Sequence, residues 1–226
     1  MDVTFPSNGT EGQGYLAVPE SGHGPGVVVL QEWWGLNDQI REVCDRFASE
    51  GFVALAPDIY RGVVTAEPDE AAKLMMALNI EQAAKDMAGA VDWLAAHDAV
   101  TSTGVGVTGY CMGGGLALWL ATLRPGVVTA VAPHYGIIPW PAAQPDYAVM
   151  TASVQGHYAE NDDFAGPPAV AALEEQLTAA GKDYELFVYP DCEHAFTNHH
   201  RPEVFHEEHS ATAWARTVEF LRANVT

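Results

Sequence analysis

The sequence predicts an α/β fold, in which a mostly parallel β-sheet is covered by helices on both faces. One observation is alternation, because strand-like apolar runs are interleaved along the chain with segments of helical periodicity. Another is that runs such as GVVVL at 26–30 are apolar throughout, which is typical of strands buried on both faces. The 226 residues contain no repeat and no low-complexity linker, so we expect one domain over 1–226.

The chain starts with DVTFPSNGTEGQGYLAVPE, where alternating polarity and turn residues at Asn8-Gly9 and Gly12 predict a β-hairpin. The strands expected after it are short apolar runs at 26–30, 52–57, 104–110, 127–136, 149–157 and 184–190. The expected helices have helical apolar periodicity and cover 38–51, 69–97, 112–123, 168–181 and 203–224. Helices between strands supply the connections that parallel pairing requires. In such sheets the chemistry is found at the carboxyl ends of the strands.

The charge of the chain limits the kinds of partner that it can bind. The net charge is −20, from 30 acidic and 10 basic residues, and such a surface repels nucleic acid and anionic membranes. No apolar run approaches the roughly 18 residues of a membrane span, and the first residues do not have the pattern of a signal peptide. We therefore expect a cytoplasmic protein. The three cysteines, Cys44, Cys111 and Cys192, form no CxxC pair and favour intracellular free thiols.

The stretch VTGYCMGGG at 107–115 carries the main chemical signal. Its residues 109–113 match the G-x-S-x-G pattern of hydrolases, with Cys111 in place of serine. Glycines on both sides allow a sharp strand-to-helix turn, and the helix N-terminus that follows favours a thiolate. A small structural cysteine under a helix is the alternative, since buried cysteines are common.

The rest of a nucleophile–acid–histidine series follows in the chain. His194 lies just after the strand expected at 184–190, and Asp162 and Asp163 lie just after the strand expected at 149–157. This is the chain order that α/β-hydrolases use, with each residue type after a strand. The order supports Cys111 as a nucleophile and His194 as its base.

These motifs resemble the dienelactone hydrolase family of α/β-hydrolases. The matching pieces occur in the family's order over nearly the whole chain, and they are QEWWGLN (31–37), PDIY (57–60), GYCMGG (109–114), NDDFAGP (161–167) and EHAF (193–196). The resemblance implies an α/β-hydrolase fold and a hydrolase of small lactones or esters, with no metal and no organic cofactor. It implies Cys111 as nucleophile and His194 as base. It selects Asp162 over Asp163, because the family's acid stands two positions before a phenylalanine.

The same resemblance implies roles for the loop after the first parallel strand. Glu32 would help to take the thiol proton when substrate arrives. The backbone N–H groups of Trp33 and Met112 would form an oxyanion hole, where two preorganised donors stabilise the transition state.

The sequence also departs from the family. Family members that bind a carboxylated lactone hold it with two arginines, and here those places hold Pro68 and Asn198. The residue after the histidine is Ala195 rather than serine. Arg61 and Arg201 are nearby candidates to replace the arginines.

Aromatic residues suggest a less charged pocket. Trp34, Tyr60 and Tyr135, together with Arg61, are our candidate substrate-binding residues, and Trp33 and Trp140 are further aromatic candidates. A place in the core is the alternative for most of these aromatics.

Two other functions stay open. Cys192 lies two residues before His194, and an approach to Cys111 would suit a redox-responsive thiol pair or binding module without hydrolysis. The second open function is acyl transfer to an acceptor other than water.

The histidine-rich segment HEEH at 206–209, with His199 and His200, lacks the spacing of a zinc protease motif, and it favours a solvated helix face and loop. We expect a monomer or small homo-oligomer that acts on a small-molecule ester or lactone.

Overall fold

The computed structural model describes residues 1–7 and 9–226, and the strands in these residues form one eight-stranded sheet in the order β1-β2-β4-β3-β5-β6-β7-β8. The strands are β1 (Asp2–Ser7), β2 (Thr10–Ala17), β3 (Gly24–Leu30), β4 (Val53–Pro57), β5 (Val100–Tyr110), β6 (Val128–His134), β7 (Ser153–Asn161) and β8 (Tyr184–Glu193). The β1–β2 and β2–β4 pairs are antiparallel, and the remaining pairs are parallel. The predicted mostly parallel sheet is confirmed.

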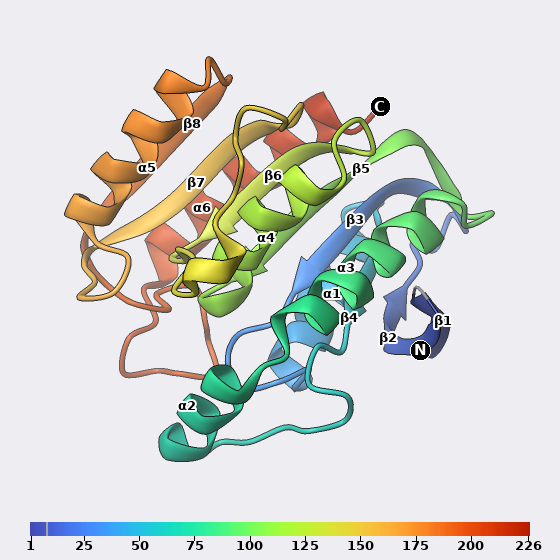
Figure 1. Ribbon diagram of the computed structural model, residues 1–226, viewed down its shortest axis with the longest axis horizontal. Coiled ribbons are helices and arrows are strands. Elements are labelled where there is room, and N and C mark those ends of the chain that lie inside the picture. The colour runs from blue at the N-terminus through green and yellow to red at the C-terminus, as the bar shows by residue number, and fades with distance from the viewer. Residues whose placement is uncertain (8) are drawn as a thin grey trace.

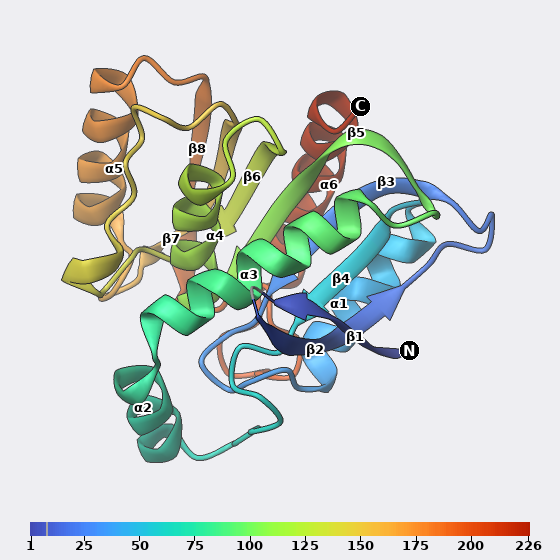
Figure 2. The same ribbon diagram turned by 45° about the vertical axis from the view of Figure 1, so that its right-hand side comes forward.

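Helices cover both faces of the sheet, as predicted (Figure 1). The α-helices of the described residues are α1 (Asp38–Ser49), α2 (Pro68–Ala77), α3 (Ile80–Ala95), α4 (Met112–Leu123), α5 (Pro167–Ala179) and α6 (Glu207–Asn224). In Figures 1 and 2, α3, α4 and α5 lie on one face of the sheet, and α1 and α6 lie on the other. None of these helices is long and apolar enough to cross a membrane.

The core has two layers because successive side chains of a strand point to opposite faces. In β3, Val28 and Leu30 pack in the layer beneath α3 and α4. Val27 and Val29 pack in the opposite layer, with residues of α1 and α6. All four valine and leucine side chains are fully buried, which explains why this strand reads as a continuous apolar run.

The largest difference from the predicted elements is in the long helix expected at 69–97. It is two helices, because α2 ends before Leu78 and α3 starts after Asn79. The Asn79 side chain accepts a hydrogen bond from the Gln82 N–H at 3.0 Å, which caps α3. Apolar periodicity continues through the break between α2 and α3, so the sequence pattern alone does not show that a new helix starts after Asn79.

Smaller differences occur at the ends of elements. β7 starts and ends later than expected, at Ser153–Asn161, and β8 continues to Glu193. α6 starts at Glu207, because the His206 side chain caps it. The predicted hairpin is present, but Gly12 lies inside β2, where a Cβ would meet the Phe5 ring at 2.4 Å. Asn8 of the predicted turn lies outside the described residues.

Candidate active site

Three side chains singled out by the sequence lie at the carboxyl ends of strands. Cys111 stands between the last residue of β5 and the first residue of α4. Asp162 follows directly after β7, and His194 follows directly after β8. The strands β5, β6, β7 and β8 are successive parallel neighbours, so their carboxyl ends lie at one edge of the sheet.

The turn at Cys111 has a strained backbone and close glycine contacts. Cys111 has a φ of 53°, which residues other than glycine rarely adopt. A Cβ on Gly113 would lie 2.4 Å from the Leu30 carbonyl oxygen, and one on Gly109 would lie 2.1 Å from that of Gly113. Glycine is therefore required for α4 to begin this close to β3 and β5. The turn leaves the Cys111 thiol partly exposed at the start of α4.

Asp162 holds the imidazole of His194. Oδ2 of Asp162 lies 2.7 Å from Nδ1 of His194. Oδ1 of Asp162 accepts hydrogen bonds from the backbone N–H groups of Phe164 and Ala165 at 2.8 and 2.9 Å. Burial raises the pKa of Asp162, but the hydrogen bond and charge of His194, together with the two backbone N–H groups, hold it below its usual range. The neighbouring Asp163 is exposed.

Opposing effects set the proton affinity of His194. Burial lowers the pKa of His194, whereas hydrogen bonds with Asp162 and with the Cys111 sulfur raise it, and the result is a pKa of about 10. The ordinary value is near 6.5, so the imidazolium is the resting form at neutral pH. The imidazolium can therefore donate a proton within the site.

Glu32 is a buried carboxylate, only 1% exposed. Its Oε1 accepts a hydrogen bond from the Tyr135 hydroxyl at 3.3 Å, and its Oε2 accepts one from Nδ2 of Asn198 at 2.9 Å. Burial raises the pKa of Glu32, although His194, Asn198 and other neighbours oppose that effect. A carboxylate with a raised pKa is a better proton acceptor than a solvated one.

Two residues that hold this carboxylate in place were missed as functional residues in the sequence. Asn198 entered only as the replacement of a family arginine, and Thr197 did not enter at all. Thr197 Oγ1 lies 2.8 Å from the Tyr135 hydroxyl, and that hydroxyl donates to Glu32. Both residues follow EHAF in the sequence, so their place after the candidate base His194 was the available signal.

A cavity of about 220 Å³ lies over the Cys111 thiol. Cys111, His194 and Glu32 all line it, and its other walls are largely apolar and come from Trp33, Trp34, Met75, Met112, Pro139, Phe164, Ala195 and Arg201. Met75 belongs to α2, so the break in the expected long helix brings a second helix to the cavity. Such a cavity suits a small ligand with a mainly apolar body.

Trp33 and Met112, the expected oxyanion-hole residues, both line this cavity. Met112 is the first residue of α4, and a helix-initial N–H has no acceptor within its own helix. The Trp33 and Trp34 rings meet edge to face at 5.0 Å between centroids. Trp34 thus lines the same cavity as the catalytic candidates.

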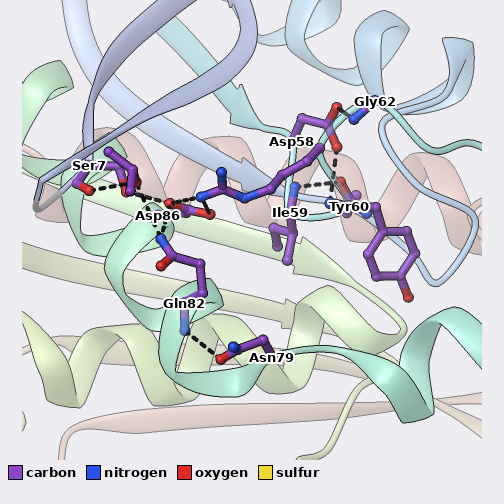
Figure 3. Close-up of polar contacts among 11 residues, drawn as sticks. Ser7, Asp58, Ile59, Tyr60, Gly62, Asn79, Gln82 and Asp86 are labelled. Carbon is purple, nitrogen blue, oxygen red and sulfur yellow. Dashed lines mark hydrogen bonds and ion pairs between the residues drawn. The ribbon is translucent and has the colours of Figure 1, made fainter.

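Arg61 and Tyr60 line a separate cavity beside α2 and α3. The Arg61 guanidinium pairs with the buried Asp86 carboxylate at 2.8 Å. Figure 3 shows Asp86 also bonded to Ser7 and Gln82, with the Tyr60 ring pointing away from this group. The Tyr60 hydroxyl contacts the Met112 sulfur at 3.3 Å. The structure therefore places these two candidates behind the cavity wall, where charge pairing with Asp86 holds the arginine.

The remaining candidates also have defined places. Tyr135 is fully buried and contacts Glu32 rather than lining the cavity. Trp140 packs against the core as a partly buried residue. All three cysteines are free thiols, and Cys192 is buried beside His206 and His209. Arg201 lines the cavity, and its Nε pairs with Glu203 at 2.9 Å.

The fold and the position of this site are those of an α/β-hydrolase. A structure from Klebsiella pneumoniae, provisionally named a dienelactone hydrolase, superposes with a TM-score of 0.87 at 27% identity, covering 98% of this chain and 97% of that one. The family model described as the dienelactone hydrolase family matches residues 13–225. The chain therefore belongs to the dienelactone hydrolase family, and it is a hydrolase of that type.

Curated relatives are similar over almost their full lengths. The protein usf of Aquifex pyrophilus is 36% identical over 230 residues, which cover 99% of this chain and 98% of the relative. A protein of Aquifex aeolicus, provisionally assigned as a carboxymethylenebutenolidase, is 33% identical over 97% of this chain and 96% of its own length. The family expected from the sequence motifs is thus confirmed.

Proposed function

We propose that this protein hydrolyses small lactones or carboxylic esters through a thioester formed on Cys111. The observation that carries the proposal is the shared cavity of Cys111 and His194, with His194 bonded to Asp162 at 2.7 Å. Nucleophile, base and orienting acid are the three parts of a triad. The Aquifex aeolicus relative is named for a lactone that carries a carboxylate, and its name supports this substrate class.

In the first half-reaction, the Cys111 sulfur attacks the carbonyl carbon. Glu32 takes the thiol proton, for which its raised pKa suits it. The N–H groups of Trp33 and Met112 bind the oxyanion, and such donors supply several kcal/mol in the transition state. The carbon–oxygen bond then breaks, and the leaving oxygen takes a proton from the imidazolium of His194.

In the second half-reaction, neutral His194 takes a proton from a water molecule that attacks the thioester carbonyl. Asp162 orients the ring through Nδ1 and stabilises the imidazolium that re-forms. The carbon–sulfur bond breaks, the acid leaves, and the sulfur recovers its proton from Glu32. The chain of proton transfers returns each group to its starting state.

The cavity walls favour a substrate with little charge. Among the described residues that line the cavity, Arg201 is the only arginine or lysine, and Glu203 already pairs with it. A volume of about 220 Å³ suits an acyl group of modest size. We therefore expect a neutral short-chain ester to be a better substrate than a carboxylated lactone.

The test compares the hydrolysis of dienelactone with that of a neutral short-chain aryl ester. Cys111→Ala should abolish turnover of both, and trapping with a slow ester should give a mass increase of one acyl group on wild-type Cys111. Cys44→Ala is the matched control, because Cys44 is a buried thiol of α1 that does not line the cavity. Turnover retained by a folded Cys111→Ala protein would refute the assignment.

A further inference from the structure

Three side chains from distant parts of the chain converge on the surface beside α1. Glu42 belongs to α1, and His199 and His200 belong to the segment between β8 and α6. Nε2 of His199 and Nε2 of His200 each lie 2.9 Å from the same oxygen, Oε2 of Glu42. We propose that these three atoms form a binding site for a divalent transition-metal ion, with Zn²⁺ as the ion best suited. This inference does not rest on the proposed hydrolysis.

The donor set fits that ion. Two imidazole nitrogens and one carboxylate oxygen are ligands that Zn²⁺ binds at about 2.0–2.2 Å, with water in a fourth position. Two nitrogens already lie at one carboxylate oxygen, so the three atoms need only small shifts to surround an ion at those distances. The sequence gives no zinc motif here, because the histidines are adjacent and the glutamate lies 157 positions from His199.

The site is open to solvent and lies in a favourable field. The three side chains are between 40 and 54% exposed, so a hydrated ion reaches them directly. The rings of His199 and His200 stand nearly perpendicular, with centroids 4.5 Å apart, and both present Nε2 to the Glu42 carboxylate. A chain with a net charge of −20 attracts cations over its surface.

A second observation comes from the cavity beside this cluster. Glu42 and His199 line a hollow of about 220 Å³ that extends inward between α1 and α6. Its wall includes Gln39 and His134, which are 2% and 1% exposed. Oε1 of Gln39 and Nδ1 of His134 have no hydrogen-bond partner among the described residues. Water ligands of an ion at the mouth of this hollow are O–H donors of the kind that the Gln39 oxygen lacks.

An ion at this cluster would join α1 to the segment that follows His194. The backbone N–H of His200 donates to Oδ1 of Asn198 at 3.0 Å, and Nδ2 of Asn198 donates to Glu32. The metal site therefore lies two hydrogen bonds from the buried carboxylate. Fixing His200 would also fix Asn198, so we expect the ion to stabilise the whole segment.

The structure contains a second cluster of possible metal ligands, and the experiment must distinguish it from the Glu42 cluster. Cys192, His206 and His209 also place ligand atoms within 4.8 Å of one another. There, however, Nδ1 of His206 accepts the backbone N–H of His209 at 3.3 Å and caps α6. Metal binding through that nitrogen would remove the cap, whereas the Glu42 cluster loses no backbone contact.

The test is calorimetric titration of ZnCl₂ into the full-length protein, in a Cys111→Ala background so that the catalytic thiol does not bind. One Zn²⁺ per chain is expected, together with a rise in melting temperature. Glu42→Gln keeps the shape of an exposed side chain. It should lower the affinity for Zn²⁺ by more than the 10–100-fold that is typical of losing an outer-shell partner. His199→Ala should do the same.

His206→Ala is the matched control, because it removes a histidine of the second cluster. Unchanged Zn²⁺ affinity in His206→Ala, with loss in Glu42→Gln and His199→Ala, supports the proposal. Absence of Zn²⁺ binding to the background protein would overturn it. Binding that survives Glu42→Gln, or that is lost only in His206→Ala, would overturn it as well. Circular dichroism of each variant separates loss of the site from loss of the fold.

Discussion

Nδ2 of Asn198 donates a hydrogen bond to Oε2 of Glu32 at 2.9 Å, between residues 166 positions apart. The resemblance to the family led us to expect an arginine at the position of Asn198 in members that bind carboxylated lactones. In this protein the position serves the buried acid of the cavity, because an amide N–H satisfies Glu32 without adding a charge.

Asn198→Ala should therefore weaken both the fold and the reaction. Loss of a hydrogen bond to a charged buried group costs roughly 1.5–3 kcal/mol, measurable by urea unfolding. The value of kcat/KM should fall about tenfold or more, because Glu32 loses its fixed orientation. Asn224→Ala is the control, since Nδ2 of Asn224 donates only to the Phe220 carbonyl near the C-terminus. Equal activity in the two variants would contradict the role of Asn198.

Asp162→Asn should lower kcat by about 10²–10⁴-fold, because the amide presents the wrong hydrogen-bonding group to the His194 ring. The neighbouring substitution Asp163→Asn changes the same charge on an exposed side chain, and its kcat should match the wild type. Steady-state kinetics on one neutral ester settles the comparison. Similar losses in both variants would mean that the loop charge, and not the His194 contact, matters.

The stability of the protein should fall as the pH rises above neutral. The pKa of His194 is raised to about 10 in the fold, whereas an unfolded histidine titrates near 6.5. The native state thus holds a proton that the unfolded state lacks, so its contribution is complete below about pH 6.5 and is lost as the pH passes 10. Each unit of pKa shift corresponds to about 1.4 kcal/mol.

Chemical unfolding at a series of pH values measures this dependence. His194→Gln should show a flatter curve between pH 7 and 10 than the wild type. Since the Cys111 sulfur helps to raise the pKa of His194, Cys111→Ala should shift the fall to lower pH. Parallel curves for wild type and His194→Gln would show that other groups cause the loss.

Arg61→Ala should lower stability without changing substrate preference. The guanidinium pairs with Asp86, which is only 4% exposed and so would keep a buried charge without its partner. The loss should be roughly 1–3 kcal/mol, since the arginine itself is about half exposed. Ser7 and Gln82 still contact Asp86 in the variant (Figure 3), which limits the effect.

Arg201→Ala should show the opposite pattern. Arg201 lines the cavity, and its partner Glu203 is 60% exposed, so no buried charge loses its partner and stability should hardly change. The ratio of kcat/KM for dienelactone to that for the neutral aryl ester should fall, with a tenfold change equal to about 1.4 kcal/mol. A ratio that changes in Arg61→Ala and not in Arg201→Ala would mean that the carboxylate of dienelactone contacts Arg61 and not the cavity over Cys111.

Much of the candidate site was predictable because it follows from chain order. The motif around Cys111 requires glycines at defined positions, and the contacts of Gly109 and Gly113 explain that requirement. Asp162 and His194 each follow a parallel strand, and parallel strands bring their carboxyl ends to the same edge. Local patterns and one topological rule were therefore enough to group Cys111 and His194 with the Asp162-Asp163 pair, and the resemblance to the family selected Asp162.

The sequence by itself determined the mostly parallel sheet and the helices on its two faces, apart from the break between α2 and α3, and it grouped Cys111 and His194 with the Asp162-Asp163 pair. Only the tertiary structure decided which side chains satisfy one another: Asn198 with Glu32, Arg61 with Asp86, and both histidines 199 and 200 with Glu42. The physical reason is that periodicity encodes which face a residue takes within its own element. A partner from a distant loop is fixed by the packing of all the elements together, and no local pattern carries that information.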